Sequence, residues 1–157
     1  MSSNYLEELA REYYEYKRYF VRSNIRFGKR GHGGYDGEID LLAYDPEEEE
    51  LLHIECSMDA KSKKEELEMA EKKFPNDIDY GKIIPFKFKV LRKIFIMGVT
   101  REQNEIEMPE GVEHISLGPF IKKVYEDLPA DIINEIVTEA RPLLRTIQLS
   151  KWAITKK

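Results

Sequence analysis

The chain has 157 residues, which is enough for one domain, residues 1–157, with a single hydrophobic core. Hydrophobic residues make up 41% and charged residues 35%, a balance typical of soluble globular proteins, and the longest apolar runs are too short to cross a membrane. The single cysteine excludes an internal disulfide framework, and no signal peptide is visible at the N-terminus, so we expect a cytoplasmic protein.

Charge is segregated along the chain. The net charge of −5 taken alone argues against a nucleic-acid partner. However, Lys and Arg occur without any acid over residues 17–34, over 82–101 and after Glu139, whereas residues 36–50 hold acids and no Lys or Arg. These blocks form either a basic groove beside an acidic site or separate solvated faces, and the sequence leaves both interpretations open.

The predicted elements alternate between helices and strands. Apolar residues recur at helical spacing over residues 4 to about 18, with Asn4 as the N-cap, and predict an amphipathic helix. Residues 19–27 predict a strand that ends in a glycine-rich loop, and a β-hairpin follows. The hairpin strands are predicted at 37–45 and 50–58, further strands at 90–99 and 112–117, and further helices at about 60–73, 119–127, 130–140 and 142–152.

Two acids lie on inward faces of the predicted hairpin. By strand alternation, Asp40 shares a face with Leu42 and Tyr44, and Glu55 shares a face with His53. A carboxylate among apolar residues is costly unless a cation or a metal pairs with it. We therefore infer that the two strands hold a divalent metal between them.

The motif around these acids resembles that of a known enzyme family. Gly37-Glu38-Ile39-Asp40 followed by Glu55-Cys56-Ser57, in a chain ordered helix, three strands, helix, two strands, resembles the PD-(D/E)XK phosphodiesterase superfamily. That group includes restriction endonucleases and archaeal Holliday-junction resolvases. The resemblance covers roughly residues 5–100. It implies an α/β fold with a restriction endonuclease-like core over residues 1–118, in which helices flank a central mixed β-sheet, and a C-terminal helical extension over 119–157.

The resemblance also implies a reaction and a metal. The expected activity is metal-dependent hydrolysis of DNA phosphodiester bonds, on branched or structured substrates. Asp40 and Glu55, with the main-chain carbonyl of Cys56, would ligate Mg²⁺ or Mn²⁺, because hard cations prefer oxygen ligands. Glu7, in the family's first-helix pattern with Ala10, would add a ligand or hold a metal-bound water. A glutamate three residues after an asparagine cap also suits a capping box, so both roles stay open.

The chain departs from the family pattern at Ser57. The family carries a lysine there, which orients the attacking water or stabilises charge on the phosphate, and a hydroxyl cannot replace that charge. Lys61, followed by Lys63 and Lys64, is the predicted substitute, unless these lysines only solvate the next helix. The alternative function is therefore a catalytically inactive nuclease fold that binds nucleic acid or a partner protein.

The glycine-rich loop between Gly28 and Tyr35 precedes the acidic strand. Glycines let a backbone approach a phosphate closely, so we predict that Lys29, Arg30 and His32 contact a nucleic-acid backbone, with a simple mobile connection as the alternative.

Three further features have plainer interpretations. His53 is predicted to be a partly buried, hydrogen-bonded residue rather than a phosphate ligand, and the tyrosines of the first helix are predicted to be core rather than base-stacking residues. The last helices, which include Trp152, cover the sheet or form a homodimer face.

Overall fold

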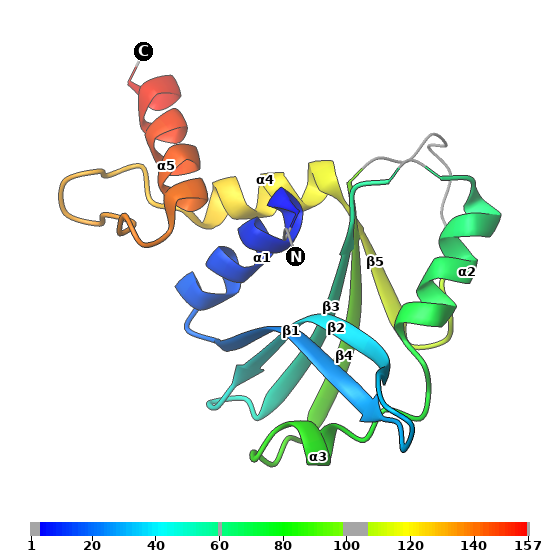
Figure 1. The fold of residues 1–157 in the computed structure, drawn as a ribbon. Coiled ribbons are helices and arrows are strands. Elements are labelled where there is room, and N and C mark those ends of the chain that lie inside the picture. The colour runs from blue at the N-terminus through cyan, green and yellow to red at the C-terminus, as the bar shows by residue number, and fades with distance from the viewer. Residues whose placement is uncertain (1–3, 60, 99–106, 157) are drawn as a thin grey trace.

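A five-stranded mixed β-sheet with helices packed on its faces forms the fold (Figure 1). In this computed structural model, residues 4–59, 61–98 and 107–156 are described. The strands are β1 Phe20–Lys29, β2 Tyr35–Asp45, β3 Glu50–Ser57, β4 Val90–Met97 and β5 Val112–Ser116. The helices are α1 Tyr5–Tyr16, α2 Lys63–Lys73, α3 Tyr80–Ile83, α4 Leu117–Asp127 and α5 Pro142–Thr155. The predicted α/β class, with a mixed sheet and a C-terminal helix, is confirmed.

The strands lie in the sheet in chain order. β1, β2 and β3 are antiparallel neighbours, whereas β3, β4 and β5 are parallel. β3 is the central strand, and it is buried from Leu51 to Ser57, as expected for a strand covered on both faces. The connection from β3 to β4 carries α2 and α3. Within the described residues, no helix is both long and apolar enough to span a bilayer.

The two faces of the sheet bury different helices. α1 and α4 pack on one face in a cluster that includes Leu41, Leu52 and Ile54 of the strands. The opposite face packs against α2 and α3, and Figure 1 shows α2 on the side of the sheet away from α1 and α4. The predicted alternation of side chains along β3 therefore places His53 and Glu55 on the face that packs against α2 and α3.

α1 forms for the reasons that its sequence predicts. The Asn4 side chain accepts a hydrogen bond from the backbone N–H of Glu7, which caps the first turn. Tyr13 and Tyr14 are buried in the core with exposed fractions of 1% and 6%, so the core interpretation of these tyrosines is confirmed. Phe20, which has the same helical spacing in the sequence, is instead 65% exposed at the start of β1, because the helix ends at Tyr16.

The predicted helix over residues 130–140 is wrong, since this segment consists of turns and bends. The Asp131 side chain accepts hydrogen bonds from the backbone of Ile133 and Asn134, a local turn that competes with a helix. The short helix α3 was not predicted. α2 begins at Lys63 rather than near Ala60, which lies outside the described residues, as does Val99 at the end of the predicted fourth strand.

Candidate active site

Asp40 and Glu55 meet where the β2–β3 ladder begins. The two strands pair from Leu41↔Ile54 to Asp45↔Glu50, and Asp40 lies just beyond this ladder. There the backbone N–H of Cys56 donates to Oδ2 of Asp40 at 2.9 Å, and the N–H of Asp40 faces Oε1 of Glu55 at 3.3 Å. The two carboxylates therefore take the place of the next backbone hydrogen bonds, which fixes both side chains against the sheet.

Strand β1 is also interrupted opposite Asp40. The β1–β2 pairing is regular up to Ser23↔Leu41 and again from Ile25↔Ile39, and it skips Asn24 and Asp40. Asn24 has a φ of 54°, in the left-handed region that asparagine tolerates better than most residues. This local break re-aims the Asp40 side chain toward Glu55.

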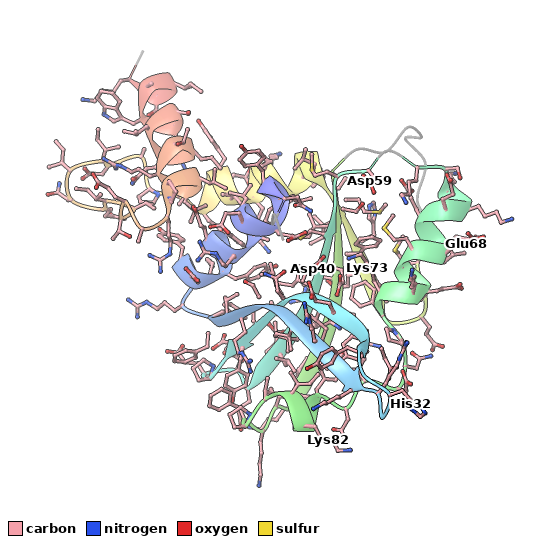
Figure 2. The ribbon with its side chains drawn as sticks, viewed as in Figure 1. His32, Asp40, Asp59, Glu68, Lys73 and Lys82 are labelled. Atoms are coloured by element: carbon pink, nitrogen blue, oxygen red, sulfur yellow. The ribbon has the colours of Figure 1, made fainter. Side chains whose placement is uncertain are left out.

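A lysine amine lies between the two carboxylates. Nζ of Lys73, the last residue of α2, is 2.6 Å from Oε2 of Glu55 and 3.1 Å from Oδ2 of Asp40. Figure 2 shows Asp40 and Lys73 facing each other at the centre of the molecule. Ala70 and Phe74 on the same side of α2 are buried against β4 in a cluster with Phe95 and Met97, and this packing anchors the helix end that carries Lys73.

A buried histidine supports Glu55 from the other side. Nε2 of His53 is 2.8 Å from Oε1 of Glu55, and Nδ1 is 2.7 Å from the hydroxyl of Tyr80 on α3. His53 and Glu55 are both fully buried. Burial lowers the pKa of His53 to about 3, and nearby Lys93 and Lys73 act in the same direction, so the ring is neutral at physiological pH. The prediction of a hydrogen-bonded histidine is confirmed, although His53 is fully rather than partly buried.

The carboxylates and the lysine perturb one another. Burial and the negative charge of Asp40 raise the pKa of Glu55 above its ordinary value, and Lys73 opposes this effect. Burial acts to lower the pKa of Lys73, but the two carboxylates outweigh it and raise this pKa above its usual range. The ammonium form of Lys73 is thus stabilised, and the site holds more negative charge than one lysine can balance.

Glu7 approaches the site from α1. One of its oxygens, Oε1, accepts a hydrogen bond from the Asn4 side-chain amide at 2.7 Å, a contact between two side chains rather than the contact with the N-cap backbone N–H that defines a capping box. Burial, followed by the charge of Asp40, raises the pKa of Glu7. Glu7 and Asp40 also line one pocket of about 210 Å³, together with Asn24. The Glu7 side chain therefore contacts the N-cap side chain and faces the site as well.

The donor set suits a hard divalent cation. Asp40 and Glu55 offer carboxylate oxygens, and Mg²⁺ is commonly bound by one or two carboxylates together with waters and substrate phosphates. Among the residues that the structure describes, no three His, Cys, Asp or Glu side chains form a metal cluster, so a third protein carboxylate is not already in place. The ammonium of Lys73 marks the point at which a cation is stabilised.

Lys61 does not supply the missing amine, contrary to the prediction. Its Nζ lies 3.9 Å from Oδ2 of Asp59, and Lys64 pairs with Glu68 along the outer side of α2. β3 ends at Ser57, so the strand that would carry Lys61 toward Glu55 does not continue. Ser57 is buried on the Glu55 side of the strand, and its hydroxyl accepts a hydrogen bond from the N–H of Asp59.

The predicted phosphate-contacting residues lie at the tip of the β1–β2 hairpin. Lys29, Arg30 and His32 are exposed, and Arg30 pairs with Asp36 at 2.8 Å. Asp40 is five residues into β2, so the tip is roughly 17 Å from it along the strand. Figure 2 shows His32 well away from Asp40 in this view. The loop therefore belongs to the surroundings of the site rather than to its centre.

The basic blocks only partly come together. Arg22, Arg26 and Lys29 of the first block line a pocket of about 610 Å³ with Lys82 of the second, but Asp36, Asp77 and Asp79 line it too. The C-terminal block lies on α5, at the opposite end of the molecule from the hairpin tip in Figure 1. Among the described residues of these blocks, no single groove therefore joins all three.

Sequence reasoning missed Lys73 and Tyr80. A signal for Lys73 was present, because Glu66, Ala70 and Lys73 share one helical face at spacings of four and three residues. Glu66 and Ala70 are both buried, so this face points at the sheet. The family pattern directed attention to residues near the end of β3 instead.

A comparison of the sequence with protein-family models found no match, and a search of curated proteins found none either. Any function must therefore be argued from the motif and the geometry of the site.

Proposed function

We propose that this protein is a metal-dependent nuclease of the PD-(D/E)XK type, hydrolysing DNA phosphodiester bonds, in which Lys73 replaces the lysine that the family carries at the position of Ser57. The observation that carries the proposal is the amine of Lys73, which reaches both Asp40 and Glu55 from helix α2. A basic side chain between two acids at a strand break is the arrangement that this chemistry requires.

Each residue has a separate role in the proposed reaction. Asp40 and Glu55, with the main chain at Cys56, would hold Mg²⁺ or Mn²⁺, which when bound would supply a Lewis acid next to the phosphate. Lys73 donates hydrogen bonds to the attacking water or to the non-bridging phosphate oxygen, where negative charge develops. The water oxygen forms the new bond to phosphorus, and the bond from phosphorus to the leaving oxygen breaks. A water proton passes to solvent, and the leaving oxygen gains a proton.

The alternative is a nuclease fold that binds nucleic acid or a partner protein without cleaving it. Ser57 in the place of the family lysine favours it. A cytoplasmic location and a homodimer through α5 remain predictions.

The decisive experiment measures cleavage of labelled linear, flap and four-way-junction DNA, and of matched RNA, with Mg²⁺ or Mn²⁺. Asp40→Asn, Glu55→Gln and Lys73→Met should each lower the cleavage rate by about 100- to 1,000-fold, because each removes charge stabilisation at the phosphate. Two lysines provide controls. Lys72→Met changes the exposed neighbour of Lys73 on α2, and Lys61→Met tests the substitute that the sequence indicated.

Both controls should cut at the wild-type rate. DNA bound but not cut by the wild type at any metal concentration would favour the binding alternative. Cleavage that persists in Lys73→Met would remove the observation on which the nuclease proposal rests.

A further inference from the structure

A hydrogen-bond chain runs from Tyr80 through His53 to Glu55. It does more than give the polar atoms of a buried histidine their partners. Its two links, 2.7 Å and 2.8 Å long, join α3 to β3 entirely within the protein interior. Glu55 is the carboxylate that both Lys73 and Asp40 contact. The chain therefore ends on the acid that we assign to the metal.

The direction of the chain follows from the donors available. Glu55 is paired with the ammonium of Lys73, so its carboxylate accepts hydrogen bonds. Nε2 of His53 must then carry the ring proton and donate to Oε1 of Glu55. Nδ1 of the neutral ring is left as an acceptor, and the Tyr80 hydroxyl donates to it. Tyr80 thus fixes which tautomer His53 adopts.

The two carboxylate oxygens of Glu55 therefore have different partners. Oε1 receives the His53 ring N–H at 2.8 Å and faces the N–H of Asp40 at 3.3 Å. Oε2 faces the ammonium of Lys73 at 2.6 Å. A carboxylate whose one oxygen is tied to two protein donors cannot readily turn both oxygens toward a cation.

We propose that Tyr80 and His53 are positioning residues that restrict Glu55 to single-oxygen metal binding through Oε2, and thereby select Mg²⁺ or Mn²⁺ against Ca²⁺. The inference deepens the proposed function and rests on its metal site. Mg²⁺ requires near-octahedral geometry with single-oxygen ligands, whereas Ca²⁺ accepts more ligands and readily takes both oxygens of a carboxylate. Partners behind a metal ligand typically change metal affinity by 10- to 100-fold.

The test is calorimetric titration of the intact chain with Mn²⁺ and with Ca²⁺, without DNA. Tyr80→Phe and His53→Leu should weaken Mn²⁺ binding by about 10- to 100-fold and lower the ratio of Mn²⁺ to Ca²⁺ affinity by about tenfold, since Oε1 is then released. His53→Gln should keep more Mn²⁺ affinity than His53→Leu, because its side-chain amide can still donate toward Oε1.

The matched control is Tyr13→Phe. The Tyr13 hydroxyl donates to Asp127 at 2.6 Å on the other face of the sheet, so this variant also loses a tyrosine hydrogen bond. It should leave the affinity ratio unchanged. In addition, ¹⁵N shifts of the His53 ring should show a proton on Nε2 in the wild type and a mixture of tautomers in Tyr80→Phe.

The outcomes separate this inference from the nuclease proposal. An unchanged ratio in Tyr80→Phe overturns the inference even if the wild type cuts DNA. The inference is also overturned if the wild type shows no Mn²⁺ binding that Asp40→Asn weakens. A wild type that binds Mn²⁺ through the Tyr80-dependent site but cuts no nucleic acid supports the inference and counts against the nuclease.

Discussion

In the proposed site, Lys73 would compete with a metal ion for the same two carboxylates. Its amine contacts Oε2 of Glu55 and Oδ2 of Asp40, the oxygens that we assign to the cation. A metal that enters must therefore displace the ammonium from at least one of them. Removing the amine should make the site a worse catalyst and a tighter metal binder.

Lys73→Met makes this competition measurable. Without metal, the free energy of unfolding should fall by about 2 kcal/mol, less than the full cost of breaking a buried pair because the Lys73 side chain is 27% exposed. Saturating Mn²⁺ should restore most of this loss, since the ion takes the place of the ammonium. Urea unfolding with and without Mn²⁺ measures both effects, and Lys72→Met is the control. Equal Mn²⁺ affinity in wild type and Lys73→Met would contradict the competition.

His53 makes the stability of the protein depend on pH. Its pKa is about 3 in the folded state, below the ordinary value of 6.5, so the unfolded state binds more protons between these values. The contribution is complete above pH 6.5 and is lost as pH falls toward 3, by up to about 1.4 kcal/mol per pH unit. His53→Gln has no such group and should lose less stability over this range. Urea midpoints from pH 6.5 downward test this, and parallel curves would show that His53 does not contribute.

At this scale the sequence predicted the two acids and missed the lysine that lies between them. Asp40 and Glu55 were recognisable because carboxylates on inward strand positions have few explanations. The lysine was sought near residue 61, where strand parity would place it, but the strand ends at Ser57. Lys73 reaches the two acids from the end of a helix. The number of residues between a strand and a later helix end does not predict that their side chains meet.

Among the elements, the strands were more predictable than the connections. Alternation and turn residues set the β2–β3 hairpin, and Asn4 set the start of α1. The segment 130–140 contains Ile133, Ile136 and Val137 at helical spacing, yet its conformation is decided by α5, which supplies partners for its backbone. The spacing of apolar residues within one segment does not indicate hydrogen bonds to a distant helix.

Gln148 is the residue of α5 that organises this segment. Its buried side chain accepts from the N–H of Val137 at 3.0 Å and donates to the carbonyls of Glu135 at 2.6 Å and Pro129 at 3.3 Å. Gln148→Met should lower the free energy of unfolding by about 2 kcal/mol, because buried backbone groups lose their partners. Amide hydrogen exchange should accelerate over residues 129–141.

Ser150→Ala is the matched control on the same helix. The Ser150 hydroxyl donates to the carbonyl of Thr146 at 2.9 Å on the exposed side of α5. Its loss should change neither the exchange pattern nor the stability by more than about 0.5 kcal/mol. Exchange rates in Gln148→Met equal to those of the wild type would mean that the segment is held by other contacts.

For the molecule as a whole, the distribution of charge decides how a nucleic acid would lie. If the hairpin tip contacts phosphates, Lys29→Ala combined with Arg30→Ala should weaken DNA binding, and the dependence of log affinity on log salt should fall by about 1.8 for two lost contacts. Fluorescence anisotropy over a range of salt concentrations measures this slope.

A double variant on the other side of the sheet provides the comparison. Lys122 and Lys123 are exposed on α4, which packs on the face opposite α2. Replacing both with alanine should leave the salt slope nearly unchanged. An equal decrease for both double variants would indicate nonspecific attraction to the whole surface, and the tip would then have no special role.

The pairing of α1 with the end of the chain has a consequence for the order in which the protein folds during synthesis. Tyr13 is hydrogen-bonded to Asp127, and Glu12 accepts from the N–H of Leu144, contacts that span 114 and 132 residues. α1 also packs on the sheet, but these two contacts form only after the later residues are made, whereas the β1–β2–β3 meander closes locally. Because Glu7 lies on α1, we expect nascent chains to hold Asp40 and Glu55 on formed strands before the helix that carries Glu7 is fully fixed against them.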